Sequence, residues 1–240
     1  MSKNLEQYIS KLDTDRFGFK VAKLNDSEDL ENIVDGLKSI GVKLIISRID
    51  SQDIEAVNQH EKLGFLLRDT QSTYKFLSSK KAPEFSSQVI IRKYEESDLD
   101  QVLSIAESSF YGYGHYAKNP NLDKQVCNDI YVDWAKNSCL NKNVADVMFV
   151  AESEGEVIGF LAFKVFNSKD NSYSAGTIGA VSEKARGKSV FKMLAVKGIH
   201  WSKEAGLDWS EHNVLINNYP VNGTFASVGF KIYRSNYTFH

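Results

Sequence analysis

Cysteine is scarce in this 240-residue sequence, and its two cysteines, Cys127 and Cys139, exclude a disulfide framework. They have no metal-ligand company in the sequence, so no metal site is expected, and a reducing compartment is the natural setting. No apolar run approaches the roughly 20 residues that a membrane-spanning helix needs. The polar first 17 residues lack the apolar core of a signal peptide. We therefore expect a cytoplasmic protein without membrane insertion.

An excess of charge of one sign is also missing. The 29 basic residues nearly balance the 31 acidic ones, which leaves a formal net charge of -2. No basic stripe is present that would attract nucleic acid, so any anion-binding site has to be local. With 42% hydrophobic residues, the chain has enough apolar mass for a substantial core, and its length allows one large or two small domains.

Proline is rare too, and one of the three prolines lies in the best candidate linker, residues 77–88, which is rich in Ser and Lys. We predict a smaller α/β domain over residues 1–80, a linker over 81–88, and a second domain over 89–240. The periodicity of the second domain predicts the order β-α-α-β-β-β-α-β-α-β. A turn at residues 152–156 joins two strands as an antiparallel hairpin. Residues 57–76 weakly echo residues 221–239, which suggests that the first domain is a degenerate half-copy of the second.

The stretch from Thr177 to Gly206 stands out from this background. It reads as a strand, a short basic turn and a helix that ends near Gly206. The first N–H groups of a helix lack intrahelical partners, and the helix dipole is positive at that end. Such a connection can therefore bind an anion, although it can also be an ordinary turn whose basic residues are merely solvated. A phosphate-binding P-loop is disfavoured because Ser182 stands where its first glycine is needed.

Taken together, the hairpin, the strand that ends in Gly179-Ala180-Val181, the turn from Lys184 to Ser189 and the late Val228-Gly229-Phe230 resemble the GCN5-related N-acetyltransferase (GNAT) family. The resemblance covers about residues 88–240. It implies an α/β (α+β) fold with a mixed, mostly antiparallel sheet flanked by helices, preceded here by a smaller partial GNAT-like domain. It also implies acetyl-CoA as co-substrate, bound by the strand, the turn and the late helix: Gly179, Ala180, Val181, Arg186, Gly187, Lys188, Ser189, Val190, Asn218, Asn222 and Phe225.

The resemblance leaves the catalytic residues unassigned. Related enzymes carry a tyrosine, the general acid for the leaving thiolate, four residues before the late glycine, and that position is Phe225 here. Nearby candidates are Tyr219, Tyr237 and His212, each of which could equally have a packing role. Residues 109–123 form a long aromatic loop, and in this family that loop lies over the acceptor. The resemblance therefore implies His115 and Tyr116 as substrate contacts.

Within the family, the layout is most similar to TDP-fucosamine acetyltransferase-type enzymes. This implies transfer of an acetyl group to the amine of a nucleotide-linked deoxyamino sugar in surface-polysaccharide biosynthesis, by direct attack in a ternary complex. The alternatives are a peptide or another small amine as acceptor, or a non-catalytic acyl-CoA-binding module. The sequence leaves homodimer formation open.

Overall fold

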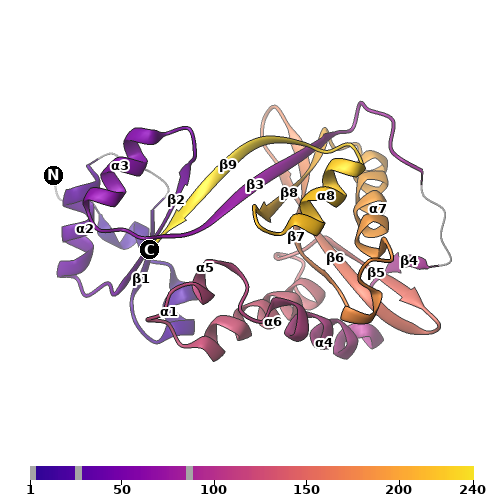
Figure 1. Cartoon of the computed structure of the whole chain (residues 1–240), viewed down its shortest axis with the longest axis horizontal. Helices are drawn as coiled ribbons and strands as arrows, with labels where there is room; N and C mark the ends of the chain where they lie inside the picture. The colour runs from indigo at the N-terminus through magenta and orange to yellow at the C-terminus, as the bar shows by residue number, and fades with distance from the viewer. Residues whose placement is uncertain (1–3, 25–28, 85–88) are drawn as a thin grey trace. The chain divides into compact units, whose positions relative to one another are not determined.

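The computed structural model describes residues 4–24, 29–84 and 89–240. Contacts between Cα atoms divide the chain into two compact units that interleave along the sequence (Figure 1). The first unit contains Met1–Gln71, Gly112–Cys127 and Arg234–His240, and the second contains Ser72–Tyr111 and Asn128–Tyr233. Strands β3 (Leu67–Leu77) and β9 (Lys231–Phe239) contribute residues to both units.

The first unit pairs β1 with β2 in parallel and β2 with β9 antiparallel. Its elements, in chain order, are η1 (Leu5–Tyr8), α1 (Lys11–Phe17), β1 (Val21–Leu24), α2 (Leu30–Ser39), β2 (Leu44–Asp50), α3 (Ile54–Lys62) and the short helix α5 (Gly114–Ala117), besides its shares of β3 and β9. The apolar face of α2, formed by Leu30, Ile33, Val34 and Leu37, packs with Ala56 of α3 and Phe239 of β9. This cluster is the core of the unit.

The second unit is built on a sheet with the strand order β3-β8-β7-β6-β5-β4. Its elements are β4 (Ile90–Lys93), η2 (Glu96–Asp98), α4 (Leu99–Phe110), most of α6 (Lys124–Leu140), β5 (Val147–Ser153), β6 (Glu156–Asn167), β7 (Ser172–Val181), η3 (Glu183–Ala185), α7 (Val190–Glu204), β8 (Trp209–Leu215) and α8 (Tyr219–Ser227), besides its shares of β3 and β9. The pairs β4–β5, β5–β6 and β6–β7 are antiparallel, and β7–β8 is parallel. The mixed, mostly antiparallel sheet that the sequence predicts is therefore confirmed.

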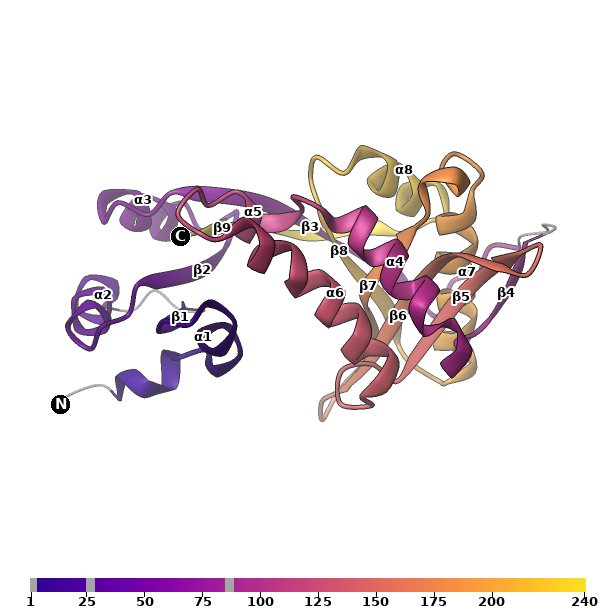
Figure 2. The same cartoon turned by 90° about the horizontal axis from the view of Figure 1, so that it is seen from below.

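Helices cover both faces of this sheet, as Figure 2 shows: α4 lies on one face and α7 on the other. Because successive side chains of a strand point to opposite faces of the sheet, alternate residues of β6 face different helices. Leu161 and Phe163 pack with Met193 and Leu194 of α7. A Cβ atom on Gly198 of α7 would lie 2.1 Å from the ring of Phe163, so α7 approaches the sheet closely.

An ion-pair network fastens the edge of the sheet. The Arg92 guanidinium on β4 donates two hydrogen bonds to Asp98, at 2.7 and 2.8 Å, and one to Glu152 of β5, at 2.7 Å. These bonds raise the pKa of Arg92, and the bond from Arg92 is the largest cause that lowers the pKa of Asp98. The side chain of Asp98 is 4% exposed, so the start of α4 is held to β4 by a largely desolvated pair.

Residues 109–123, expected as one long loop, are not a loop throughout, because α5 and the last two residues of α4 lie inside them. Residues 85–88 of the expected linker fall outside the described residues. Over the described ranges, no helix combines the length and the apolar character that crossing a membrane requires.

Candidate active site

Strands β7 and β8 run side by side and then separate. Within the described chain, their parallel pairs extend from Tyr173–Trp209 to Gly176–His212, while β7 continues to Val181 and β8 to Leu215. On the other edge of β7, the pairing with β6 shifts between Gly176 and Gly179, so that residues 177 and 178 face a single residue of β6. A β-bulge of this kind bends its strand and is common next to active sites. We call residues 177–181 of β7 together with residues 213–215 of β8 the fork.

The β7 side of the fork offers free backbone. Residues 179–181 pair with β6 along one edge, which leaves the other edge for a partner in the fork. Gly179 is required here by close packing, because a Cβ atom would lie 2.5 Å from Leu161 Cδ1 and 2.9 Å from the Phe160 carbonyl oxygen. Edge N–H and C=O groups in this position can pair with an amide-containing chain, as a strand would.

The turn that follows β7 is exposed and basic. Arg186, Gly187, Lys188 and Ser189 are all exposed, and Gly187 and Ser189 have left-handed φ angles of 75° and 60°. Over residues 4–24, 29–84 and 89–240, the backbone N–H groups of Gly187 and Ser189 make no hydrogen bond. The Ser189 side chain does not cap α7 either. These N–H groups, at the positive end of a 15-residue helix, are therefore open to an anion.

A buried imidazole lies where the pairing of β7 with β8 ends. His212 is the last residue of β8 that pairs with β7, and it is 3% exposed. Its ring stacks on Phe225 of α8, with the centroids 4.4 Å apart, and meets Phe163 and Phe230 edge-on at 5.6 and 5.3 Å. A Cβ atom on Gly176 would lie 2.0 Å from His212 Nδ1, so glycine is needed opposite the ring.

The polar atoms of this imidazole are not all satisfied. His212 Nε2 is buried and has no hydrogen-bond partner among the described residues. Burial lowers the pKa of His212 to about 3, so the ring is neutral at physiological pH. A general base that accepts a proton near pH 7 needs a pKa closer to neutrality, so burial makes His212 poorly suited to that role.

The late helix α8 uses its asparagines in different ways. Asn222 Nδ2 donates to the carbonyl oxygens of Leu215 at 2.9 Å, Ile216 at 3.3 Å and Asn218 at 2.8 Å, and so fastens α8 to the end of β8. Asn218 precedes the helix, and its side chain makes no capping hydrogen bond. Phe225 is 1% exposed and packs against Phe191 and Phe230 as well as His212.

The two tyrosine candidates lie in different surroundings. Tyr219 is 76% exposed at the start of α8. Tyr237 lies on the part of β9 that belongs to the first unit and packs against the core of that unit. The ring of Tyr237 lies 6.4 Å from that of Phe239, within the same unit.

His115 and Tyr116, expected to contact the acceptor, are buried on α5 within the first unit. His115 Nδ1 lies 2.8 Å from His240 Nε2, and Tyr116 donates its hydroxyl to Asp13 at 2.9 Å. Burial and the neighbouring His240 lower the pKa of His115 to about 2, and burial lowers that of His240 to about 4. Both expected residues thus make internal bonds, and their contact with an acceptor stays a prediction.

One aromatic residue near the fork was missed in the sequence. Tyr74 of β3 is 5% exposed, and its ring centroid lies 5.5 Å from that of Phe225. Burial raises the pKa of its hydroxyl, which therefore stays protonated. The echo between Tyr74-Lys75-Phe76 and the end of the chain is the signal that singled out this segment, but periodicity alone could not place it beside α8.

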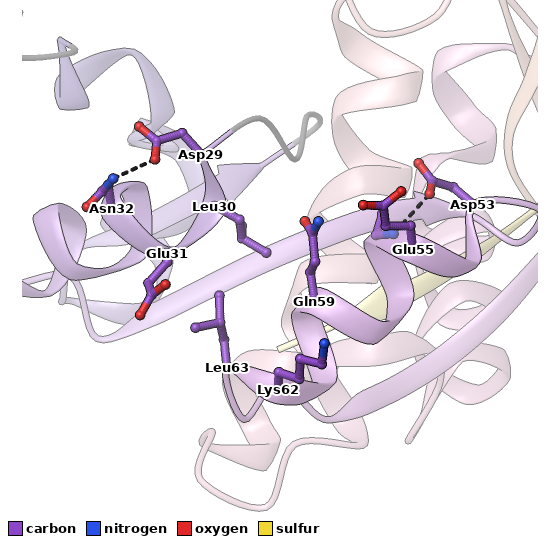
Figure 3. Close-up of a pocket in the computed structure, with 10 residues that line it drawn as sticks. Asp29, Leu30, Glu31, Asn32, Asp53, Glu55, Gln59, Lys62 and Leu63 are labelled. Carbon is purple, nitrogen blue, oxygen red and sulfur yellow. Dashed lines mark hydrogen bonds between the residues drawn. The ribbon is translucent and has the colours of Figure 1, made fainter.

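The first unit contains a hollow of about 610 Å³ between the start of α2 and the length of α3, with Lys62 also in its lining (Figure 3). Four carboxylates line it: Asp29, Glu31, Asp53 and Glu55. Asp29 accepts a hydrogen bond from Asn32, and Asp53 caps α3 by accepting from the Ala56 N–H. This acidic lining is unsuited to an anionic ligand. In the described residues, no group of three or more His, Cys, Asp or Glu converges as a metal site would require.

Comparison with known families decides the assignment. The sequence model of the acetyltransferase (GNAT) family matches residues 100–230, more than half of the chain. The chain belongs to the GNAT family. The matched region contains the whole fork, the basic turn and α8. Members of the GNAT family are acyl-CoA-dependent N-acyltransferases with acetyl-CoA as co-substrate. The free N–H groups and basic side chains of the turn fit the diphosphate of that molecule.

Solved structures support the GNAT fold. A GCN5-related N-acetyltransferase from Sphaerobacter thermophilus has a TM-score of 0.59 and 12% identity over 88% of this chain and 65% of its own. A tandem GNAT protein of the clavulanic acid biosynthesis pathway has a TM-score of 0.62 and 10% identity over 91% of this chain and 74% of its own. At these identities the likeness concerns the fold alone.

A third structure is described as a GCN5-related glucosamine N-acetyltransferase region in a fungal multi-domain GH3 β-N-acetylglucosaminidase. Its TM-score is 0.61 and its identity 11%, over 92% of this GNAT chain and 30% of that protein. This GNAT chain thus spans slightly less than two thirds of the Sphaerobacter protein and a smaller share of the fungal one. No curated protein is similar enough in sequence to count as a match.

Proposed function

We propose that this protein acetylates the amino group of a nucleotide-linked deoxyamino sugar in the cytoplasm, for surface-polysaccharide biosynthesis, by direct attack in a ternary complex. The amine nitrogen bonds to the thioester carbonyl carbon, the C–S bond breaks, and the displaced amine proton leaves on the thiol of CoA. Acetyl-CoA supplies the activated acetyl group, and the chain supplies binding and orientation. Holding two reactants in a fixed geometry can account for roughly 7–11 kcal/mol of the barrier.

The observation that carries the co-substrate site is the exposed turn with unpaired N–H groups at the start of α7. We assign the diphosphate to residues 186–190, where two backbone donors and two basic side chains lie at a positive helix end. We assign the pantetheine arm to the open edge of residues 179–181. Asn218, at the start of α8, keeps a side chain free of capping bonds for the same ligand, whereas Asn222 serves to position α8.

The acceptor rests on weaker support. The two-part layout resembles nucleotide-sugar acetyltransferases, and one structural neighbour is described as a glucosamine N-acetyltransferase region. Both indications favour an amino sugar over a peptide amine. The decisive assay measures CoA release from acetyl-CoA with a panel of nucleotide-linked amino sugars, simple amino sugars and peptide amines. Turnover with peptide amines alone would contradict the proposed acceptor.

Gly187→Asp tests the diphosphate site. We expect it to abolish acetyl-CoA binding in calorimetry, because a carboxylate would repel the phosphates beside the free N–H groups. Gly187→Asn has nearly the same shape without the charge and should bind more tightly than Gly187→Asp. Gly206→Asp is the matched control: Gly206 has a φ of 71° against 75° at Gly187, and neither has a neighbour within 4 Å of a Cβ position. Undiminished binding by Gly187→Asp would contradict the assignment.

A further inference from the structure

A smaller hollow lies in the second unit, where α6 ends and β5 begins. Its volume is about 190 Å³, and its lining comes from the end of β4, from most of residues 138–148 and from Trp201 of α7. Trp201 follows Val190, the first residue of α7, by 11 residues, so it lies roughly 16 Å along the helix from the basic turn. The hollow is therefore separate from the turn that we assign to the diphosphate.

Two hydroxyl groups in the lining of this hollow have no partner. Ser138 on α6 is 5% exposed, and Tyr94 directly follows β4. Among residues 4–24, 29–84 and 89–240, neither hydroxyl oxygen finds a hydrogen-bond partner, although both are buried. Buried polar atoms are almost always paired, with protein, water or a ligand. Because a serine side chain moves between staggered rotamers without a change in the backbone, a molecule in the hollow can reach the Ser138 hydroxyl.

A second buried serine shows what a purely structural hydroxyl looks like in this unit. Ser202 on α7 is 1% exposed, and its hydroxyl donates to the Gly198 carbonyl oxygen at 2.8 Å and lies 2.6 Å from Ser174 Oγ. A carbonyl oxygen one turn back is the usual partner of a serine inside a helix. Ser138 also lies inside a helix but makes no such bond, and it differs from Ser202 in lining a hollow.

The interior of the hollow combines neutral donors with apolar surface. Burial and the neighbouring Cys139 raise the pKa of Tyr94 to about 12, and burial raises the pKa of Cys139 to about 11, so both groups stay protonated at neutral pH. The Cys139 thiol is directed at Met148 Sδ, at 3.7 Å. The two unpaired hydroxyls thus remain as donors, beside the side chains of Met148 and Trp201.

The mouth of the hollow is positively charged. Lys93 and Lys142 are exposed in its lining, and neither forms an ion pair in the part of the chain that the structure describes. The carboxylate in the lining, that of Asp146, is already engaged. Lys164 Nζ donates to its Oδ1 at 3.1 Å, and the Val165 N–H donates to its Oδ2 at 2.7 Å. Two ammonium groups beside neutral donors favour an anionic ligand.

The size of the hollow limits that ligand. A cavity of about 150 Å³ can hold benzene, so about 190 Å³ has room for one six-membered ring with a carboxyl group. Water alone would occupy it poorly. At roughly 30 Å³ each, about six waters would fit, and the apolar side chains would leave most of them short of hydrogen-bond partners.

We propose that this hollow binds a small amphipathic carboxylate. Its carboxylate accepts hydrogen bonds from the hydroxyls of Ser138 and Tyr94, and its apolar body packs against Trp201 and Met148. The lysines at the mouth attract the negative charge. The site does not depend on acetyl-CoA or on the acceptor amine, so it stands or falls separately from the proposed function.

The first test uses benzoate as the probe and benzyl alcohol as its neutral counterpart of nearly the same size. In an NMR titration of the full chain, benzoate should shift the resonances of Ser138, Tyr94 and the Trp201 indole, and should leave residues 186–190 in place. The dissociation constant should be about 1–10 mM, as expected for so small a ligand, and benzyl alcohol should bind at least about threefold more weakly. Equal affinities would contradict a carboxylate site. No shift with about 50 mM benzoate would show that the hollow holds water only, and would overturn the proposal.

Two serine variants test the contact itself. Ser138→Ala should weaken benzoate binding roughly threefold to tenfold, the range expected for one hydrogen bond. Because the Ser138 hydroxyl has no partner in the ligand-free protein, the midpoint of urea denaturation should not fall in this variant.

Ser202→Ala is the matched control, because it removes a buried helical hydroxyl that has two partners. Its urea midpoint should fall while its affinity for benzoate stays the same as in the wild type. Unchanged benzoate affinity in Ser138→Ala would contradict the site. A urea midpoint that falls as far in Ser138→Ala as in Ser202→Ala would show that the Ser138 hydroxyl is structural, and would also contradict it.

Discussion

At the scale of single residues, the second unit is most constrained where Gly176 meets His212. Burying an unpaired polar nitrogen costs about 1–3 kcal/mol, so His212 stabilises this core position less than a phenylalanine would. Gly176 adds to that cost, because glycine inside a strand loses backbone entropy and packs no side chain. Two unfavourable residues that depend on each other are typical of a functional site rather than of a core optimised for stability.

Their dependence can be measured. Gly176→Ala should destabilise the protein by about 1–3 kcal/mol, because the new methyl group would overlap the His212 ring. In a His212→Ala background the same change should cost far less. A double-mutant cycle in urea denaturation should therefore give a coupling energy of at least about 0.5 kcal/mol.

Gly36→Ala provides the control for this cycle. Its Cβ atom would approach Leu5 in the first unit, at 2.9 Å, so its cost should not change when His212, in the second unit, is replaced. Additive free energies for Gly176→Ala and His212→Ala would show that the ring does not occupy the space over Gly176.

At the scale of elements, the start of α7 combines strain with exposure. Ser189 adopts a φ of 60°, which is uncommon for a residue other than glycine, and it gains no capping bond in return. Strain of this kind persists where the surrounding structure enforces it, often at ligand sites.

Ser189→Gly should relieve this strain. Left-handed backbone at a non-glycine residue costs of order 1–3 kcal/mol, and glycine loses roughly 0.5–1 kcal/mol through the entropy of the unfolded chain. The net gain should be about 1 kcal/mol and should raise the melting temperature by about 2–4 °C, as followed by circular dichroism. Acetyl-CoA binding should persist, because the backbone N–H remains. A lower melting temperature would show that the hydroxyl stabilises the turn.

At the scale of the whole molecule, buried neutral histidines link stability to pH. Burial is the main cause that lowers the pKa values of His115, His212 and His240, to about 2, 3 and 4, against about 6.5 in an unfolded chain. Below pH 6.5 the unfolded chain therefore binds protons that the folded protein does not. The neutral histidines therefore contribute fully to the free energy of unfolding above that pH. This contribution is lost as the pH falls toward their pKa values in the folded protein.

Urea denaturation at pH 7.5, 6.0 and 5.0 should accordingly show a falling free energy of unfolding. Each such imidazole contributes a slope of up to about 1.4 kcal/mol per pH unit. Asp69, whose pKa burial raises, acts in the opposite direction and reduces the slope. His240→Asn should make the decline shallower than in the wild type. A free energy of unfolding that stays level between pH 6.5 and 5.0 would contradict this account.

Local sequence patterns were sufficient to predict several secondary-structure elements of this protein. Alternation and turn residues predicted the hairpin of β5 and β6, and the strand, basic turn and helix from Thr177 to Gly206 appeared nearly where expected. These features depend on neighbours within a few residues, so the sequence carries them directly. The family resemblance rested on the same local motifs, and the linear domain boundaries at residues 80 and 89 stay a prediction.

Tertiary structure decided what surrounds those motifs. Residues 112–127 and 234–240 belong to the first unit, although they are distant from it in sequence. Tyr74 packs beside Phe225. Packing of this kind brings together residues that are far apart in the chain, so local patterns do not reveal it. The resemblance also pointed to the basic turn and residues 179–181 as the co-substrate site, without showing where β7 and β8 separate. The bulge in β7, the end of its pairing with β8 and the unpaired nitrogen of His212 depend on strand register, and register is fixed by packing over the whole sheet.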